Sequence, residues 1–150
     1  MKTELPEASA PAVKLFACFS RFEFALKECG YVKRGKYEGA EPDWDKFSRL
    51  DHLPVLMERL RDSRAAPELF ANPPQKQMFD DGYWKWAEAA AITDPKTFID
   101  AIKRVRNNLF HGGKAGANPR DDVLCDDAVA CLVALLELDQ SVSNAFQGRY

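Results

Sequence analysis

Several common features are missing from this sequence, and each absence narrows the fold and the function. No apolar run approaches the roughly 18 residues of a membrane-spanning helix, so we expect none. The first residues, MKTELPEASAP, lack the apolar stretch of a secretory signal, and we therefore expect a cytoplasmic protein. Neither sign of charge dominates, since the net charge is −2, so a binding site for a polyanion has to be a local patch.

Metal-ligating residues are also scarce. The sequence has two histidines and four cysteines, and no two cysteines follow a C-x-x-C spacing. We therefore expect reduced thiols, no metal site and no cofactor. The cysteines are Cys18, Cys29, Cys125 and Cys131.

The composition is that of one ordinary globular domain. The chain has 150 residues, of which 46% are hydrophobic and 29% charged, and it contains no internal repeat. Residues 1–8 are predicted to be a flexible N-terminal tail, and residues 9–150 a single helical domain.

The first predicted helix begins at Ser9, an N-cap residue type, and ends near Gly30. Its apolar stripe at helical spacing contains Leu15, Phe16, Phe19, Phe22 and Leu26. Glu23 lies within that stripe, and a carboxylate that faces a core is costly unless a cation pairs with it. We expect the partner to be an arginine of another helix, with Lys27 on the same helix as the alternative.

The middle of the sequence is the hardest part to interpret. Residues 30–42 resemble a loop, Asp43 can cap a short helix that reaches Leu50, and another helix is predicted from about His52 to about Arg64. Prolines and Gly82 interrupt residues 64–84, where we expect short turns, with Trp84 and Trp86 packed onto the body of the protein.

Two long helices are predicted in the C-terminal part. Thr93 or Asp94 caps the first of them, and Gly112 with Gly113 ends it. The second begins after Asn118 and is expected to run to about Phe146. The predicted buried face of the first contains Phe98, Ile102, Val105 and Leu109. Because no segment alternates clearly with a period of two, the predicted fold class is all-α: a bundle of about four to five helices with a long C-terminal helix.

Positive charge gathers at the turn between these two helices. Residues 101–120 include five Lys or Arg and no acid, whereas residues 121–150 include six acids and one Arg. The helix dipole accounts for Lys103 and Arg104, but less well for Arg106 and His111. Histidine moves protons near neutral pH, and arginine binds phosphate with two parallel hydrogen bonds. With the neutral Asn107, these residues suit phosphoryl chemistry on a polyanion without a metal, although a lone histidine at a helix end is most often a C-cap.

On a regular helix, Arg106 and His111 point about 140° apart. The two side chains can share one site if the last helical turn frays, or if they meet across a two-fold dimer axis.

The segment RNNLFH, Arg106 to His111, resembles the R-x(4–6)-H signature of the HEPN superfamily, and Asn107 matches the polar residue that commonly follows the arginine. Its position at the end of a penultimate helix, before glycines and one more long helix, is also similar to that family. The segment FSRFEFALK (19–27) resembles the first helix of small bacterial HEPN-like proteins.

The resemblance implies a homodimeric helical bundle that cleaves RNA without a metal, in a toxin–antitoxin or phage-defence setting. The RNA 2′-OH would attack the adjacent phosphate and leave a 2′,3′-cyclic phosphate, so DNA would not be cut. His111 would transfer protons, Arg106 would stabilise the phosphorane charge and Asn107 would orient the site. Lys103, Arg104 and Lys114 would bind flanking phosphates, and Glu23 would hold Arg106 in place.

Gly113 departs from one HEPN toxin group, which has a tyrosine at that position, so the nucleotidyltransferase-like antitoxin of that group is not expected. A different antitoxin or protein partner remains compatible with the sequence. The alternative to a nuclease is a non-catalytic HEPN-like dimer that uses the same surface to bind RNA or a protein.

Overall fold

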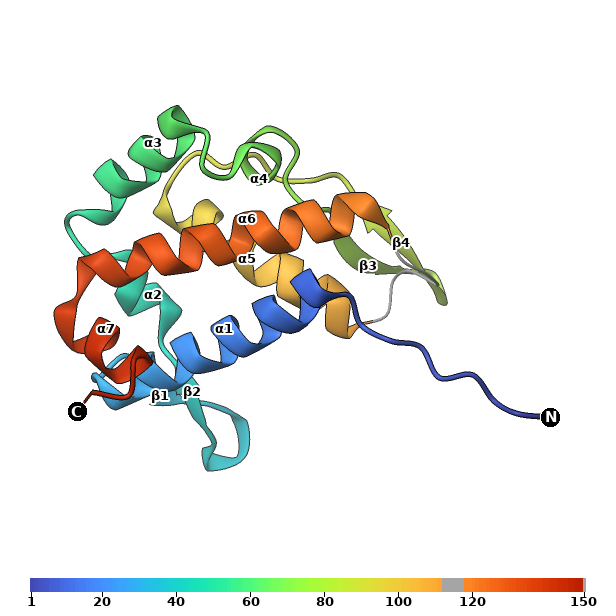
Figure 1. Ribbon diagram of the computed structural model, residues 1–150, viewed down its shortest axis with the longest axis horizontal. Helices are drawn as coiled ribbons and strands as arrows, with labels where there is room; N and C mark the ends of the chain where they lie inside the picture. The colour runs from blue at the N-terminus through green and yellow to red at the C-terminus, as the bar shows by residue number, and fades with distance from the viewer. Residues whose placement is uncertain (112–117, 150) are drawn as a thin grey trace.

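The computed structural model describes residues 1–111 and 118–149, and Figure 1 shows the arrangement of its elements. The α-helices are α1 (Ala10–Glu28), α2 (Trp44–Ser48), α3 (Leu53–Ser63), α4 (Pro67–Ala71), α5 (Pro95–Phe110), α6 (Pro119–Leu135) and α7 (Gln140–Phe146). The strands are β1 (Val32–Arg34), β2 (Ala40–Pro42), β3 (Lys76–Asp80) and β4 (Tyr83–Ala87), and two short 3₁₀ turns are η1 (Lys36–Glu38) and η2 (Leu136–Leu138).

The all-α prediction is wrong. The protein is 60% helical but also has two antiparallel two-stranded sheets, which hold 11% of its residues, so its class is mixed α/β. The loop predicted over residues 30–42 contains the hairpin β1–β2, and the turns predicted over residues 64–84 contain α4 and most of the hairpin β3–β4. Trp84 is 41% exposed on that second hairpin, so it does not pack onto the body as predicted.

The β3–β4 hairpin has a local physical cause. Asp80 pairs with Tyr83, which leaves Asp81 and Gly82 as a two-residue loop. Both loop residues have positive φ, 45° and 86°. An Asp-Gly loop with this backbone matches the twist of the flanking strands, and it is the commonest kind of tight hairpin turn.

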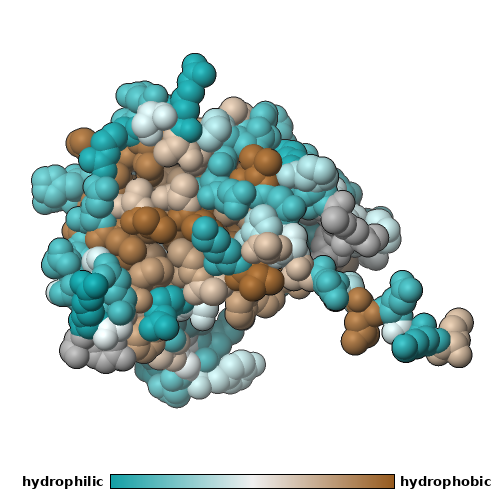
Figure 2. All heavy atoms as spheres, viewed as in Figure 1, coloured by the Kyte–Doolittle hydropathy of each residue, from teal (hydrophilic) through white to brown (hydrophobic). Residues whose placement is uncertain are grey.

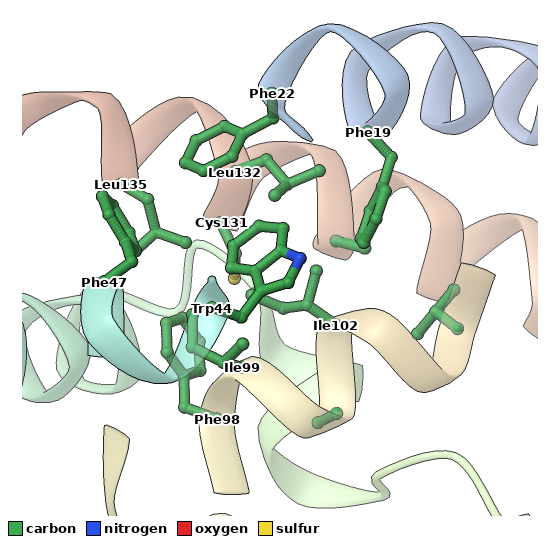
Figure 3. Packing of buried hydrophobic residues seen from close by; sticks show 14 of the residues in the cluster. Phe19, Phe22, Trp44, Phe47, Phe98, Ile99, Ile102, Cys131, Leu132 and Leu135 are labelled. Atoms are coloured by element: carbon green, nitrogen blue, oxygen red, sulfur yellow. The ribbon is translucent and has the colours of Figure 1, made fainter. Parts of the chain in front are cut away.

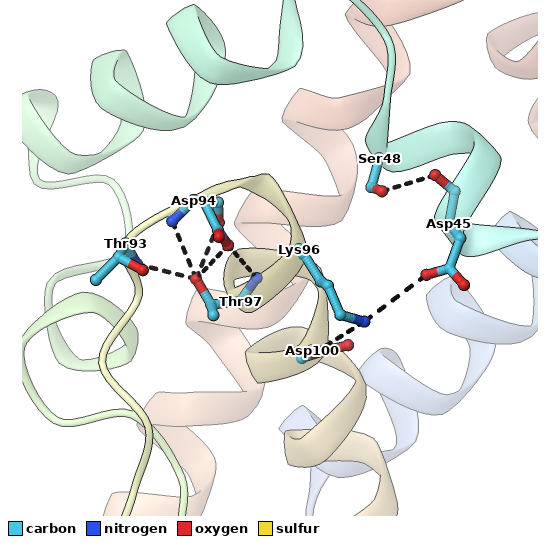
Figure 4. Close-up of polar contacts among 7 residues, drawn as sticks. All are labelled: Asp45, Ser48, Thr93, Asp94, Lys96, Thr97 and Asp100. Carbon is cyan, nitrogen blue, oxygen red and sulfur yellow. Dashed lines mark hydrogen bonds and ion pairs between the residues drawn. The ribbon is translucent and has the colours of Figure 1, made fainter.

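The ends of the long helices are fixed by side-chain caps. Ser9 Oγ accepts a hydrogen bond from the Ala12 amide (3.2 Å) and donates one to Asp122 Oδ1 (2.6 Å), which ties the start of α1 to the first turn of α6. Asp94 and Thr97 form a capping box at the start of α5 (Figure 4). The Thr97 amide and hydroxyl donate to Asp94, and these hydrogen bonds lower the pKa of that carboxyl.

The last helix is interrupted, contrary to the prediction of one helix to about Phe146. Regular helix ends at Leu135, and α7 begins after Asp139. Asp139 accepts hydrogen bonds from the amides of Ser141 (2.8 Å) and Val142 (3.2 Å), and its other oxygen accepts one from the Tyr31 hydroxyl (2.7 Å). A side chain that competes for backbone amides in this way starts a new helix rather than continuing the old one.

One hydrophobic core takes in residues from α1 through α7. Figure 3 shows the part of it where α1, α2, α5 and α6 meet. At its centre the Trp44 ring lies parallel to the Phe22 ring at 5.2 Å, and Phe47 meets both rings edge-on. Outside the core, Figure 2 shows hydrophobic side chains along the seam between α1 and α6, with polar side chains on either side. No helix of the described segments combines the length and the apolar character that crossing a bilayer needs.

The four thiols should differ in reactivity. Burial raises the pKa of all four thiols, and for Cys125 and Cys131 it raises the pKa to about 12, with a smaller contribution from nearby aspartates. Cys18 and Cys29 are partly exposed, whereas Cys125 and Cys131 are buried. Because the thiolate is the nucleophile, iodoacetamide at pH 8 should modify Cys18 and Cys29 in the folded protein, and Cys125 and Cys131 only after unfolding. Mass spectrometry of native and urea-treated samples measures this, and equal rates at all four would contradict the burial.

Candidate functional site

The candidate site lies on the last turns of α5 (Figure 1). Phe98, Ile99, Ala101, Ile102 and Val105 are buried and fix the side of the helix that faces the core. The buried face ends at Val105, because Leu109 is 39% exposed and Phe110 is 61% exposed. The prediction that Leu109 completes the core face is therefore wrong, and the end of α5 presents apolar side chains to solvent.

Arg106 points from α5 towards α1. Its Nη1 lies 3.5 Å from Glu23 Oε1, and its guanidinium lies over the Phe19 ring at 4.4 Å from the ring centroid. The other Glu23 oxygen accepts a hydrogen bond from the buried Trp44 indole N–H at 2.8 Å. The Arg106 and Glu23 side chains are 28% and 21% exposed, so this cluster is only partly shielded from water.

The pairing expected for Glu23 with an arginine of another helix is thus present, and Lys27 forms no ion pair within the described part of the chain. The contacts of Arg106 are an ion pair and a cation–π contact. Within that part its side chain makes no hydrogen bond, and its buried Nε has no partner. The guanidinium has a donor without a hydrogen-bond partner and lies beside an open hollow, so it can turn towards a phosphate oxygen. The role of Glu23 in holding Arg106 for catalysis stays a prediction.

The remaining candidate residues share a different side of α5. Arg104, Asn107 and His111 follow one another at spacings of three and four, which places them on one helix face, with Lys103 beside them. All four line an open hollow of about 370 Å³ between α5 and β3. Lys76, Gln77, Asp100 and Asn108 complete its walls. We call this the cationic hollow.

Arg106 does not line the cationic hollow. It lines a second hollow, of about 280 Å³, with Glu23, Lys27, Phe16 and Phe110 among its other residues. The last turn of α5 is regular as far as His111, whose amide donates to the Asn107 carbonyl at 2.9 Å, so His111 is the C-cap residue. A frayed turn that brings His111 and Arg106 together is therefore not observed, and the two-fold axis is the route that remains. Lys114 lies outside the described residues.

Three residues that the sequence did not single out take part in these surroundings. Trp44 shares Glu23 with Arg106, and Lys76 and Gln77 form the β3 wall of the cationic hollow. The Asn108 side chain donates to the Gln75 carbonyl at 2.9 Å and fastens β3 to α5. The signal that could have identified Lys76 and Gln77 is the turn sequence of the hairpin, because it predicts β3 and β4.

Within the described residues, no group of three or more His, Cys, Asp or Glu side chains is placed to hold a metal ion. Comparison of the chain with protein-family models, with curated proteins and with solved structures finds no match.

Proposed function

We propose that this protein is a homodimeric, metal-independent endoribonuclease of the HEPN type that acts on cytoplasmic RNA. The observation that carries the proposal is the cationic hollow, where His111 and Asn107 stand on one helix face beside Lys103 and Arg104. An exposed imidazole at the edge of a cationic surface is a group that can exchange protons with a ribose bound through its phosphates.

The reaction needs no group beyond these side chains. His111 accepts the proton of the ribose 2′-OH, and the 2′-oxygen forms a bond to the adjacent phosphorus. The bond from phosphorus to the 5′-oxygen of the next nucleotide then breaks, and that oxygen takes up a proton from water, which regains one when His111 releases the proton that it accepted. The products are a 2′,3′-cyclic phosphate and a 5′-OH, and Arg106 stabilises the charge on the phosphorane oxygens between these steps.

The dimer supplies the arrangement that one chain lacks. Phe16 (54% exposed) and Phe110 (61%) line the hollow that holds Arg106, and the centres of their rings are 5.6 Å apart. Val13 (54%) lies one turn before Phe16 on α1. We call these three residues the apolar patch. A two-fold contact through this patch joins the ends of two α5 helices and lets Arg106 of one protomer face His111 of the other.

Phe110→Asp should weaken the dimer. A phenylalanine removed from an interface forfeits about 1.5–3 kcal/mol, and each dimer loses two, so the dissociation constant should rise by about a hundredfold or more. Sedimentation over a concentration series measures it, with Val55→Asp as the control because Val55 is 69% exposed on α3. A variant that dimerises like the native protein would exclude the apolar patch as the interface.

Cleavage is tested with end-labelled structured and unstructured RNAs in the presence of EDTA, beside DNA of the same sequence. RNA products with cyclic-phosphate ends and uncut DNA would support the nuclease. Cleavage that needs added Mg²⁺, or equal cutting of DNA, would contradict the proposed reaction.

One observation favours a second function, a non-catalytic dimer that binds RNA or a protein. Arg106 and His111 line separate hollows within one chain, and Arg106 already has Glu23 as a partner. Under this function a well-folded dimer binds RNA without cutting it. A toxin–antitoxin or phage-defence setting, with an antitoxin or another protein as partner, belongs to the nuclease proposal and rests on the family resemblance.

A further inference from the structure

The β3–β4 hairpin exposes aromatic side chains beside the cationic hollow. Phe79 is 81% exposed, Tyr83 is 72% exposed and Trp84 is 41% exposed. Large aromatic side chains normally dominate cores and interfaces, and this twelve-residue hairpin, 76–87, exposes three of them. Phe79 and Trp84 form a surface that a ligand can cover. The hairpin stands at the same end of the molecule as the end of α5 (Figure 1).

The strand register aligns the aromatic face with the cationic hollow. Phe79 pairs directly with Trp84, so their side chains lie on the same face of the hairpin. Gln77 is two residues before Phe79 and therefore on that face as well, and Gln77 lines the cationic hollow. Because a strand rises about 3.4 Å per residue, the aromatic pair begins about 7 Å beyond the wall of the hollow.

The charges around this surface favour an anion. Lys76, Lys103 and Arg104 line the cationic hollow, and none of the three forms an ion pair within residues 1–111 and 118–149. Its single carboxylate, that of Asp100, lies 3.8 Å from Lys96 Nζ (Figure 4). On the hairpin, Asp80 is neutralised by Lys85 at 3.0 Å.

We propose that the exposed aromatic side chains of the β3–β4 hairpin stack on unpaired RNA bases while the phosphates of the same strand lie over Lys76, Lys103 and Arg104. Aromatic side chains next to free cations are the combination that binds single strands, since every base offers a π-face and every nucleotide a phosphate. In a duplex the base faces are already stacked, so paired RNA offers only its phosphates. The proposal takes its ligand class from the proposed function and deepens it, because it makes unpaired nucleotides the substrate that is brought to His111.

The test uses an RNA that cannot be cleaved. A fluorescent 2′-O-methyl oligonucleotide without self-complementarity lacks the attacking hydroxyl, and the same strand annealed to its complement is the paired form. Fluorescence anisotropy gives the affinity of the native dimer and of Phe79→Ser/Trp84→Ser for both. The control is Tyr37→Ser, because Tyr37 is 99% exposed on the other hairpin, β1–β2.

The double substitution should weaken single-strand binding at least about tenfold, and Tyr37→Ser should leave it unchanged. Trp84→Phe, which keeps a stacking ring, should retain most of the affinity, and the native protein should prefer the single strand to the duplex. Unchanged binding by the double variant, equal affinity for single strand and duplex, or no binding of either by the native protein would each overturn the proposal. Circular dichroism confirms that each variant is folded.

This readout is independent of catalysis. Hairpin-dependent binding by a protein that cuts no RNA would leave the stacking surface standing and end the nuclease proposal. If the native protein cleaves ordinary RNA and the double variant binds RNA normally, the nuclease proposal stands and the stacking surface is excluded.

Discussion

His111→Ala is expected to lower the rate of RNA cleavage in EDTA by about 10²–10⁴-fold, the usual contribution of a positioned acid or base. The fold should survive, because His111 is exposed and its contribution to the end of α5 is made by its backbone amide. The matched control is His52→Ala, since His52 is the other histidine, is exposed and precedes α3. A His111 variant that cleaves at the native rate would remove His111 from the mechanism.

Arg106→Ala belongs to the same experiment. Loss of one donor to a developing oxyanion lowers rates by about 10²–10³-fold, and Arg49→Ala on an exposed helix end serves as its control.

Mixing the inactive Arg106→Ala and His111→Ala variants then tests the dimer. If each site takes Arg106 from one protomer and His111 from the other, every mixed dimer has one intact site and one doubly damaged site, so activity returns. If both residues come from one protomer, no mixed dimer regains a complete site and the mixture stays inactive.

The separation of Arg106 and His111 was predictable, since five residues of helix turn the side chains about 140° apart. Whether one chain could bring them together depended on whether the last turn of α5 frays, and the sequence could not decide that. The Asn107–His111 backbone hydrogen bond shows a regular turn. The placement of these two side chains within one chain is therefore set by helix periodicity.

The fold was predictable where caps and periodicity agree, as at Ser9, Asp43, Asp94 and Asn118, each of which caps the helix that follows it. The two hairpins were missed for different reasons. β1 and β2 have three residues each, too few for alternation to show, whereas Asp81-Gly82 is a strong turn signal that the neighbouring prolines obscured. The break after Leu135 has a local signal, since Asp139 caps α7, but the apolar spacing that continues past it concealed the break. The contact of Asp139 with Tyr31, 108 residues away, is carried by no local pattern.

The partner of Glu23 was predictable in part from the position of this carboxylate in the sequence. A carboxylate within an apolar stripe predicts a cation because burial of an unpaired charge is costly, and this argument needs no structure. The choice between Lys27 and an arginine depends on which helix lies against α1, and the packing of α5 there decides it. The indole of Trp44 could not be foreseen, since nothing near residue 44 indicates that its ring reaches α1.

Glu23→Ala is expected to lower the free energy of unfolding by about 2–4 kcal/mol. The substitution leaves the indole N–H of Trp44, which is 4% exposed, without its acceptor. A buried donor without a hydrogen bond costs about 1–3 kcal/mol. It also leaves Arg106 without its counter-charge next to the Phe19 ring, which adds a smaller cost because that side chain is partly exposed. Urea unfolding measures the change, and Glu28→Ala, an exposed carboxylate on the same helix, should stay within about 0.5 kcal/mol of the native protein.

Glu23→Gln separates the two contacts. Glutamine keeps an oxygen that can accept from Trp44 but has no charge for Arg106, so the stability loss should fall to about half of that for Glu23→Ala or less. If Glu23 positions Arg106 for catalysis, Glu23→Gln should still lower cleavage, and combining it with Arg106→Ala should add little further loss, because residues in one network are not additive. If Glu23 only supports the fold, cleavage by Glu23→Gln should match the native rate and the losses should add.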